Sequence, residues 1–163
     1  MTVNITSRLR SRFLGLFALA AIGLSASSAG LAASSCELAT SGGLSFGSYN
    51  AGSAANINAT GTFQYKCLGF SLPATAVVTA ATGSSGTYAY RTMMNGSNTL
   101  RYQLYTDPGR TIVFATQASG GAITLNLDNL NSFRTVNFYG TVPAGQAPPP
   151  GVYNDSLNLT LTY

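Results

Sequence analysis

The chain has 163 residues, of which 45% are hydrophobic and 7% charged, and it contains no histidine. This length suits one ordinary domain together with processing segments. The lack of histidine excludes a histidine-based catalytic triad and any imidazole metal ligand.

The first 32 residues predict a secretory signal peptide. Three arginines between positions 8 and 12 form a basic head, Phe13 to Leu24 is an uninterrupted apolar run, and residues 25–33 are mostly small. This order is typical of a signal peptide. A membrane-spanning helix would need about 20 apolar residues, which is longer than this run. We therefore expect residues 1–32 to be removed and the mature domain to span 33–163, with the cleavage point uncertain by a few residues.

Charge in the mature domain is low and scattered. The whole chain carries a net +4 from eight basic and four acidic residues. Three of the basic residues belong to the predicted leader, so the mature part holds five against four and has a net charge of +1. Binding to nucleic acid needs clustered Lys and Arg. We therefore predict no nucleic-acid partner and no transmembrane segment in the mature chain.

The two cysteines, Cys36 and Cys67, predict a disulfide, because an even cysteine count in an exported chain favours pairing. Only one intramolecular pairing is available. The chain-entropy model gives a bridge that closes a loop of about 30 residues roughly 3 to 4 kcal/mol of stabilisation. A metal site is disfavoured because histidine is absent and the acidic residues are isolated. We expect no cofactor.

From Cys36 onward the sequence predicts short β-strands separated by turns. Apolar and polar residues alternate with period two, and no stretch shows a helical period. The alternating segments are 62–67, 99–105, 123–128, 136–142 and 156–163, with shorter candidates at 44–49, 74–81 and 111–114.

Turn residues fall between these segments. Asp107-Pro108-Gly109 is a strong turn sequence, and Asn95-Gly96 and Gly120-Gly121 are further candidates. Residues 148–151 (PPPG) cannot donate ladder hydrogen bonds at three successive positions and read as a rigid connector. About seven or eight short strands with one apolar face predict an all-β, antiparallel β-sandwich. We see no internal repeat.

The last predicted strand raises a question of pairing. Its apolar residues alternate from Leu157 to the final residue, Tyr163, and Asp155 is the only charge nearby. An exposed edge strand is normally blunted by charge, proline or a bulge. The strand therefore either lies inside the sheet or is completed by a partner chain.

Catalysis and sugar binding are weaker interpretations. Two carboxylates could form a glycosidase pair, but the acidic residues stand in ordinary turn and strand-flanking positions, so we predict no enzyme activity. Tyrosines could stack on sugars, although tyrosine is common in half-buried strands. The acidic residues are Glu37, Asp107, Asp128 and Asp155, and the candidate tyrosines are Tyr88, Tyr90, Tyr102, Tyr105 and Tyr139.

Three segments resemble the spore coat protein U domain, which also occurs in subunits of archaic chaperone–usher pili. They are 44–49 (LSFGSY), 91–93 (RTM) followed by 100–107 (LRYQLYTD), and the ending 151–163 (GVYNDSLNLTLTY). The resemblance covers essentially the whole mature chain.

The resemblance implies an incomplete immunoglobulin-like sandwich that is completed by a donated strand. The donor would be a periplasmic chaperone and later a neighbouring pilus subunit, with an outer-membrane usher assembling the fibre. The Cys36–Cys67 bridge would tie the first two strands together. The strand beside the groove would carry Leu157, Leu159, Leu161 and Tyr163, and the C-terminal carboxylate would lie near the chaperone's anchoring residues.

One feature departs from the pattern of fibre-forming subunits. Those subunits carry an alternating donor segment before the first cysteine, whereas a start at Ala33 leaves only Ala33, Ser34 and Ser35. Such a protein could accept a strand but would have none to give. This favours a tip or capping subunit.

The leading hypothesis is therefore a structural subunit of a bacterial surface fibre, exported to the periplasm and then the cell surface, that supports adhesion or biofilm formation. The alternative is a secreted β-sandwich binding module, for carbohydrate or coat association, that does not polymerise. A β-sandwich hydrolase is a third possibility.

Overall fold

The structure is a computed structural model that describes residues 1–10, 33–40 and 43–163. The described part is all-β, with one 3₁₀ turn, η1 (Gly83–Ser85), and no helix long and apolar enough to cross a membrane. Its ten strands are β1 (Thr2–Arg10), β2 (Ser35–Thr40), β3 (Leu44–Ser45), β4 (Ile57–Leu68), β5 (Thr75–Ala80), β6 (Arg91–Asn95), β7 (Asn98–Tyr105), β8 (Ile123–Asn126), β9 (Arg134–Val142) and β10 (Asn154–Thr162). The predicted all-β, immunoglobulin-like sandwich is confirmed, and the described strands pair in the predicted antiparallel way except β1 with β10, which are parallel.

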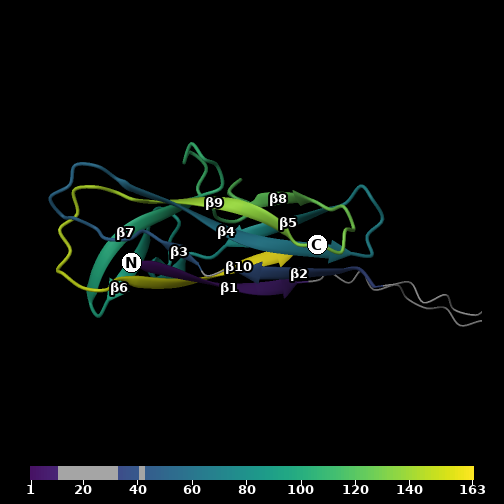
Figure 1. Cartoon of the computed structure of the whole chain (residues 1–163), viewed down its shortest axis with the longest axis horizontal. Helices are drawn as coiled ribbons and strands as arrows, with labels where there is room; N and C mark the ends of the chain where they lie inside the picture. The colour runs from purple at the N-terminus through teal and green to yellow at the C-terminus, as the bar shows by residue number, and fades with distance from the viewer. Residues whose placement is uncertain (11–32, 41–42) are drawn as a thin grey trace, which may run out of the picture.

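Two layers of strands enclose the core and are joined through β7 (Figure 1). One layer has the order β2-β4-β9-β7, and the other contains β8-β5-β10-β1-β3. The β6–β7 hairpin turns at Gly96, which has a φ of 58°, a backbone conformation that glycine adopts without steric cost. Strand β6 also touches β10 through the pair Asn154 and Met94.

The apolar faces predicted by the alternation do form the core. On each of the five long segments the apolar members of the alternation are mostly buried, as a strand with one covered face requires. Most of the polar members are partly or fully exposed, and Gln103 and Thr141 are buried exceptions. The buried members are Phe63, Tyr65 and Cys67; Leu100, Tyr102 and Leu104; Leu125 and Leu127; Phe138 and Val142; and Leu157, Leu159 and Leu161.

Of the shorter candidates, segment 74–81 is confirmed as β5, and the other two differ from the prediction. Segment 44–49 contributes only the two-residue strand β3. The expected strand at 111–114 is absent, and Val113 makes a single bridge to Tyr105. The reason is local: the backbone N–H groups of Thr111 and Ile112 donate to the Asp107 carboxylate at 3.0 and 2.8 Å. These donors close the turn and are not available to a ladder.

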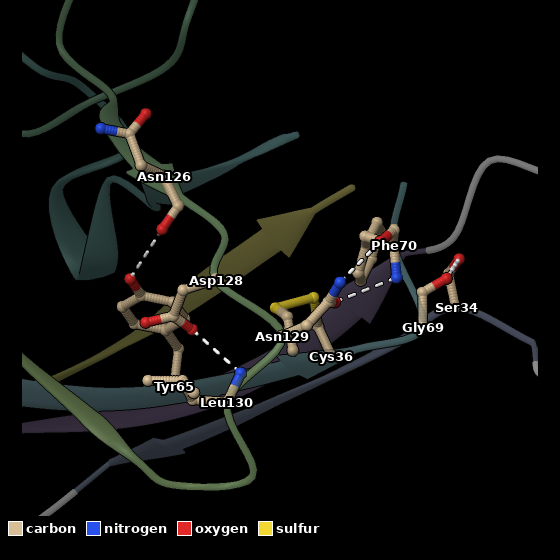
Figure 2. Close-up of a disulfide and its surroundings, with 10 residues drawn as sticks. Ser34, Cys36, Tyr65, Gly69, Phe70, Asn126, Asp128, Asn129 and Leu130 are labelled. Atoms are coloured by element: carbon tan, nitrogen blue, oxygen red, sulfur yellow. Dashed lines mark hydrogen bonds between the residues drawn. A yellow bond between two sulfur atoms is a disulfide. The ribbon is translucent and has the colours of Figure 1, made fainter. Parts of the chain in front are cut away.

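The predicted disulfide is present at one end of the sandwich (Figure 2). Cys36 and Cys67 face each other directly in the β2–β4 ladder, with Cα atoms 4.1 Å apart. Nearby, Asn129 exchanges two hydrogen bonds with the backbone of Phe70, at 3.0 and 2.6 Å. These contacts fix the loop after β8 against the end of β4.

The first ten residues form a strand that the sequence analysis did not expect. Strand β1 lies on β10, inside the segment predicted to be a leader. The remainder of that segment, 11–32, lies outside the residues that the structure describes. The leader and the 33–163 domain boundary therefore remain predictions.

Candidate strand-binding groove

Strand β1 fills a strip between β10 and β3, which we call the β10 groove. All nine residues of β1 pair with β10 in parallel register, from Thr2 opposite Asn154 to Arg10 opposite Thr162. On its other side β1 pairs with β3 at only two positions. Figure 1 shows β1 and β10 side by side with their arrows in the same direction. The opposite edge of β10 is occupied by β5 and β6.

Backbone contacts hold the start of β1 from both sides. The Thr2 N–H donates to the carbonyl of Tyr153 at 3.2 Å, while the Met1 carbonyl accepts from the Phe46 N–H at 3.1 Å. The terminal ammonium of Met1 donates to the carbonyl of Gly47 at 3.2 Å. The groove therefore accepts the backbone of an extended segment, which is the interaction used in β-strand addition.

Side chains of β1 fill the groove at alternate positions. Val3 is 0% exposed and Ile5 is 8% exposed, whereas Asn4 between them points outward. Gly43 lies against the backbone of β1, and a Cβ there would overlap the carbonyl oxygen of Val3. Further along, Leu9 is 46% exposed. The tight part of the groove therefore lies at the start of β10.

A buried carboxylate fixes this same end of β10. Asp155 is 3% exposed and accepts hydrogen bonds from the hydroxyls of Tyr102 and Ser84, both at 2.6 Å, and from the Ser84 N–H at 3.0 Å. Gly83 makes this approach possible, because a Cβ there would overlap the carboxylate. Burial raises the pKa of the Tyr102 hydroxyl, and the hydrogen bond to Asp155 raises it further.

A second buried polar group, the guanidinium of Arg91, lies behind this carboxylate network. Arg91 is 0% exposed, and burial lowers its pKa. It donates to the carbonyls of Ala81 and Phe114 and to Gln103 Oε1, with distances between 2.6 and 3.1 Å. A buried charge is tolerated only when it is fully hydrogen-bonded. Both polar groups are engaged by the fold and have the geometry of structural supports.

An open cleft of about 520 Å³ continues the groove beyond Met1. Tyr49 and Tyr153 line it, together with the proline-rich connector 148–150. The Tyr153 hydroxyl donates to the Pro149 carbonyl at 2.7 Å, and Tyr49 exchanges hydrogen bonds with the backbone of Gln146. The connector is thereby held at the side of the cleft.

The residues predicted to line a partner-strand groove lie on β10 or just after it. Leu157, Leu159 and Leu161 are buried on the inner face, directly opposite Ile5, Ser7 and Leu9 of β1. Tyr163 follows the strand and is half-buried, with its ring 5.5 Å from that of Phe70 in an edge-to-face contact. The structure thus brings the three leucines to the groove and turns the tyrosine toward Phe70.

The residues considered for catalysis have separate structural roles. Glu37 pairs with Lys66 at 3.1 Å, Asp128 pairs with Arg134, Asp107 closes its turn, and Asp155 anchors β10. Within the described ranges, no three His, Cys, Asp or Glu residues are grouped so that they could hold a metal.

The candidate sugar-binding tyrosines have no shared role. Tyr102 is hydrogen-bonded to Asp155, and the Tyr88 hydroxyl donates to the Ala80 carbonyl at 2.9 Å. The rings of Tyr90 and Tyr139 are faced by Arg101 and Arg110, at 4.5 and 5.6 Å. These contacts use the tyrosines inside the fold or pair them with cations.

Comparison with known proteins gives the family. The model of the Spore Coat Protein U domain matches residues 23–160. The chain belongs to the Spore Coat Protein U domain family. It is also 34% identical over 135 residues to Protein U of Myxococcus xanthus, a match that covers 75% of this chain and 72% of that protein. Strand β1 lies outside the residues that match the family model.

A solved structure supports the fold. One chain of the crystal structure of the CsuC–CsuE chaperone–tip adhesion subunit pre-assembly complex, from archaic chaperone–usher Csu pili of Acinetobacter baumannii, matches with a TM-score of 0.52 at 14% identity. The match covers 80% of this chain and 40% of the solved chain, so this protein spans about two fifths of the length of that chain. At this identity the likeness shows the shared fold.

Proposed function

We propose that the domain formed by residues 33–163 is a structural, non-catalytic subunit of a surface fibre and accepts a strand from a partner along β10. The observation that carries this proposal is the edge of β10. Apart from β1, which lies in the predicted leader, the structure pairs nothing with that edge over the nine residues of β10 within the part of the chain it describes. Removal of the leader would leave the edge free for another strand.

The nature of the edge favours strand addition over a permanently open surface. Leu157, Leu159 and Leu161 lie beside it, and an uncovered, apolar edge of this length invites pairing with another chain. Membership of the Spore Coat Protein U domain family and the fold shared with a chain of a chaperone–tip adhesion subunit complex support a periplasmic chaperone, an outer-membrane usher and neighbouring subunits as partners. Export to the periplasm and then the cell surface follows from the same assignment.

The position in the fibre follows from what precedes Cys36 after cleavage. A mature chain that starts near Ala33 has no segment long enough to serve as a donor strand, because nine residues of β1 are needed to cover β10 here. We therefore propose a tip or capping position, with a role in adhesion or biofilm formation.

The test is to purify the exported protein from the periplasm after expression alone and after co-expression with a periplasmic chaperone of the archaic chaperone–usher type. We expect a low yield of marginally stable protein alone, and a one-to-one complex with a large increase in melting temperature when the chaperone is present. A stable monomer that ignores the chaperone would reject the fibre proposal and favour a secreted binding module.

A further inference from the structure

We propose that residues 2–10 block the β10 groove for as long as they stay joined to the domain, so that the uncleaved chain cannot accept a partner strand. This inference rests on the proposed function, since it names the occupant that keeps the same groove closed before a partner arrives. It assigns the basic head of the predicted leader a second role as an internal plug.

The pairing of β1 has the extent expected of a true occupant. It covers β10 from Asn154 to Thr162 without a break in register, and its second neighbour is β3. The Thr6 hydroxyl also donates to the side chain of Asn158, the residue directly opposite in the ladder. A partner strand could not form the same backbone hydrogen bonds until β1 had left.

The side chains of β1 match the shape of the groove. Val3 and Ile5 enter the tight part of the groove, where Gly43 leaves room for the β1 backbone. The two arginines of the strand, Arg8 and Arg10, are exposed, so no charge is buried. Val3 and Ile5 thus lie where the groove is closed, whereas the two arginines and Leu9 lie where it is open to water.

The covalent connection strengthens the block. A segment that belongs to the same chain as its binding site competes intramolecularly, so a free partner must displace it without that advantage. A partner strand should therefore bind the uncleaved chain at least about tenfold more weakly than a chain whose plug is disabled. Cleavage between the leader and the domain would remove this advantage.

The first test compares two single substitutions in the full chain, Val3→Asp and Asn4→Asp. Both add one carboxylate to β1, but only Val3 is buried in the groove. Hydrogen exchange should become at least tenfold faster at the β10 amides that face β1 in Val3→Asp and should be unchanged in Asn4→Asp. Equal exchange in the two variants would overturn the proposal.

A second measurement does not depend on a destabilising change. Thr6→Cys combined with Asn158→Cys places thiols at directly paired positions, whereas Thr6→Cys with Ser156→Cys shifts the pair by two residues. Mild oxidation of the full chain should form the new disulfide in the first variant and not in the second. Formation in both or in neither would show that β1 does not hold this register.

The third test separates this proposal from the function on which it rests. The probe is the periplasmic chaperone used in the test of the proposed function, added to the uncleaved wild-type chain, to Val3→Asp and to Asn4→Asp. We expect at least tenfold tighter binding to Val3→Asp than to the other two. Equal, tight binding to all three would overturn the plug. The chaperone could also fail to bind any of the three chains while the cysteine pair confirms the register of β1. That result would reject the fibre function and, with it, the proposed exclusion of a partner. The pairing of β1 with β10 would still be established.

Discussion

Strands β1 and β2 each add an N-terminal segment to one layer of the sandwich, but they are fixed in different ways. Strand β2 runs antiparallel to β4, and a disulfide joins the pair at Cys36 and Cys67. Strand β1 runs parallel to β10 and is held there by non-covalent contacts, chiefly backbone hydrogen bonds and the buried side chains of Val3 and Ile5. The disulfide therefore fixes β2 to β4, whereas β1 can leave β10 without the breaking of a disulfide.

The two strands therefore give different kinds of stability. Loss of the bridge at β2 acts on the unfolded chain, because the cross-link limits its conformational freedom. Loss of β1 acts on the folded chain, because it uncovers one edge of β10 and leaves the rest of the core in place. This difference is open to experiment.

The largest expected effect comes from removing the disulfide that joins β2 to β4. In the full chain, Cys36→Ala with Cys67→Ala should lower the free energy of unfolding by roughly 3 to 4 kcal/mol, as measured by chemical denaturation. The matched control is Glu37→Gln, which removes an exposed ion pair in the same β2–β4 ladder and should cost about 1 kcal/mol or less. A cysteine variant as stable as the control would show that β2 is held by its ladder alone.

The next largest effect concerns the hydrogen bond between Tyr102 and Asp155, the buried carboxylate on β10 beside β1. Tyr102→Phe removes the 2.6 Å hydrogen bond to the buried Asp155 and should lower the free energy of unfolding by about 1.5 to 3 kcal/mol. Tyr105→Phe, on the same strand, is the control and should change the free energy of unfolding by no more than about 0.5 kcal/mol. An equal effect of both substitutions would mean that Asp155 does not depend on Tyr102.

The same tyrosine predicts a loss of stability in alkali. Burial raises the pKa of Tyr102 above its ordinary value of 10.0. A group with a raised pKa contributes stability that is fully present below the unfolded pKa and is lost as the pH rises above it. The melting temperature should therefore fall above about pH 10, and the fall should be smaller in Tyr102→Phe. An unchanged pH dependence in that variant would place the cause elsewhere, for example at Tyr65, whose pKa is also raised by burial.

The strands that bury only one face could be predicted from the sequence. Alternation predicted the buried faces around Phe63, Leu104, Phe138 and Leu159, because a period of two and a single covered face give a direct pattern. Segment 111–114 failed for a local reason, since Asp107 takes the N–H groups that a strand would need. A composition rich in strand-forming residues does not reveal such competition.

The candidate site was only half readable. Alternation indicated that the last strand either lies inside the sheet or is completed by a partner chain, but it did not reveal β1 as the neighbour that the structure places on its edge. Val3 and Ile5 alternate with Asn4 and Thr6, a period-two signal that the basic head and apolar run of a leader masked. A parallel pairing between the two ends of a chain leaves no local pattern. The burial of Arg91 was likewise hidden, because its partners include backbone carbonyls of distant loops.

The smallest expected effect tests whether turns outside both strands add to stability in acid. Hydrogen bonds from Ile112 and Thr111 lower the pKa of Asp107 below its ordinary value of 3.8. Its contribution is therefore present above that pH and is lost as the pH falls through the lower, folded pKa. Asp107→Asn should flatten the decline in melting temperature between about pH 4 and pH 2. Asp128, whose pKa is lowered by Leu130 and Arg134, should keep part of the decline in place. If Asp107→Asn leaves the acid profile unchanged, the turn does not contribute to acid sensitivity, and the decline arises elsewhere in the fold.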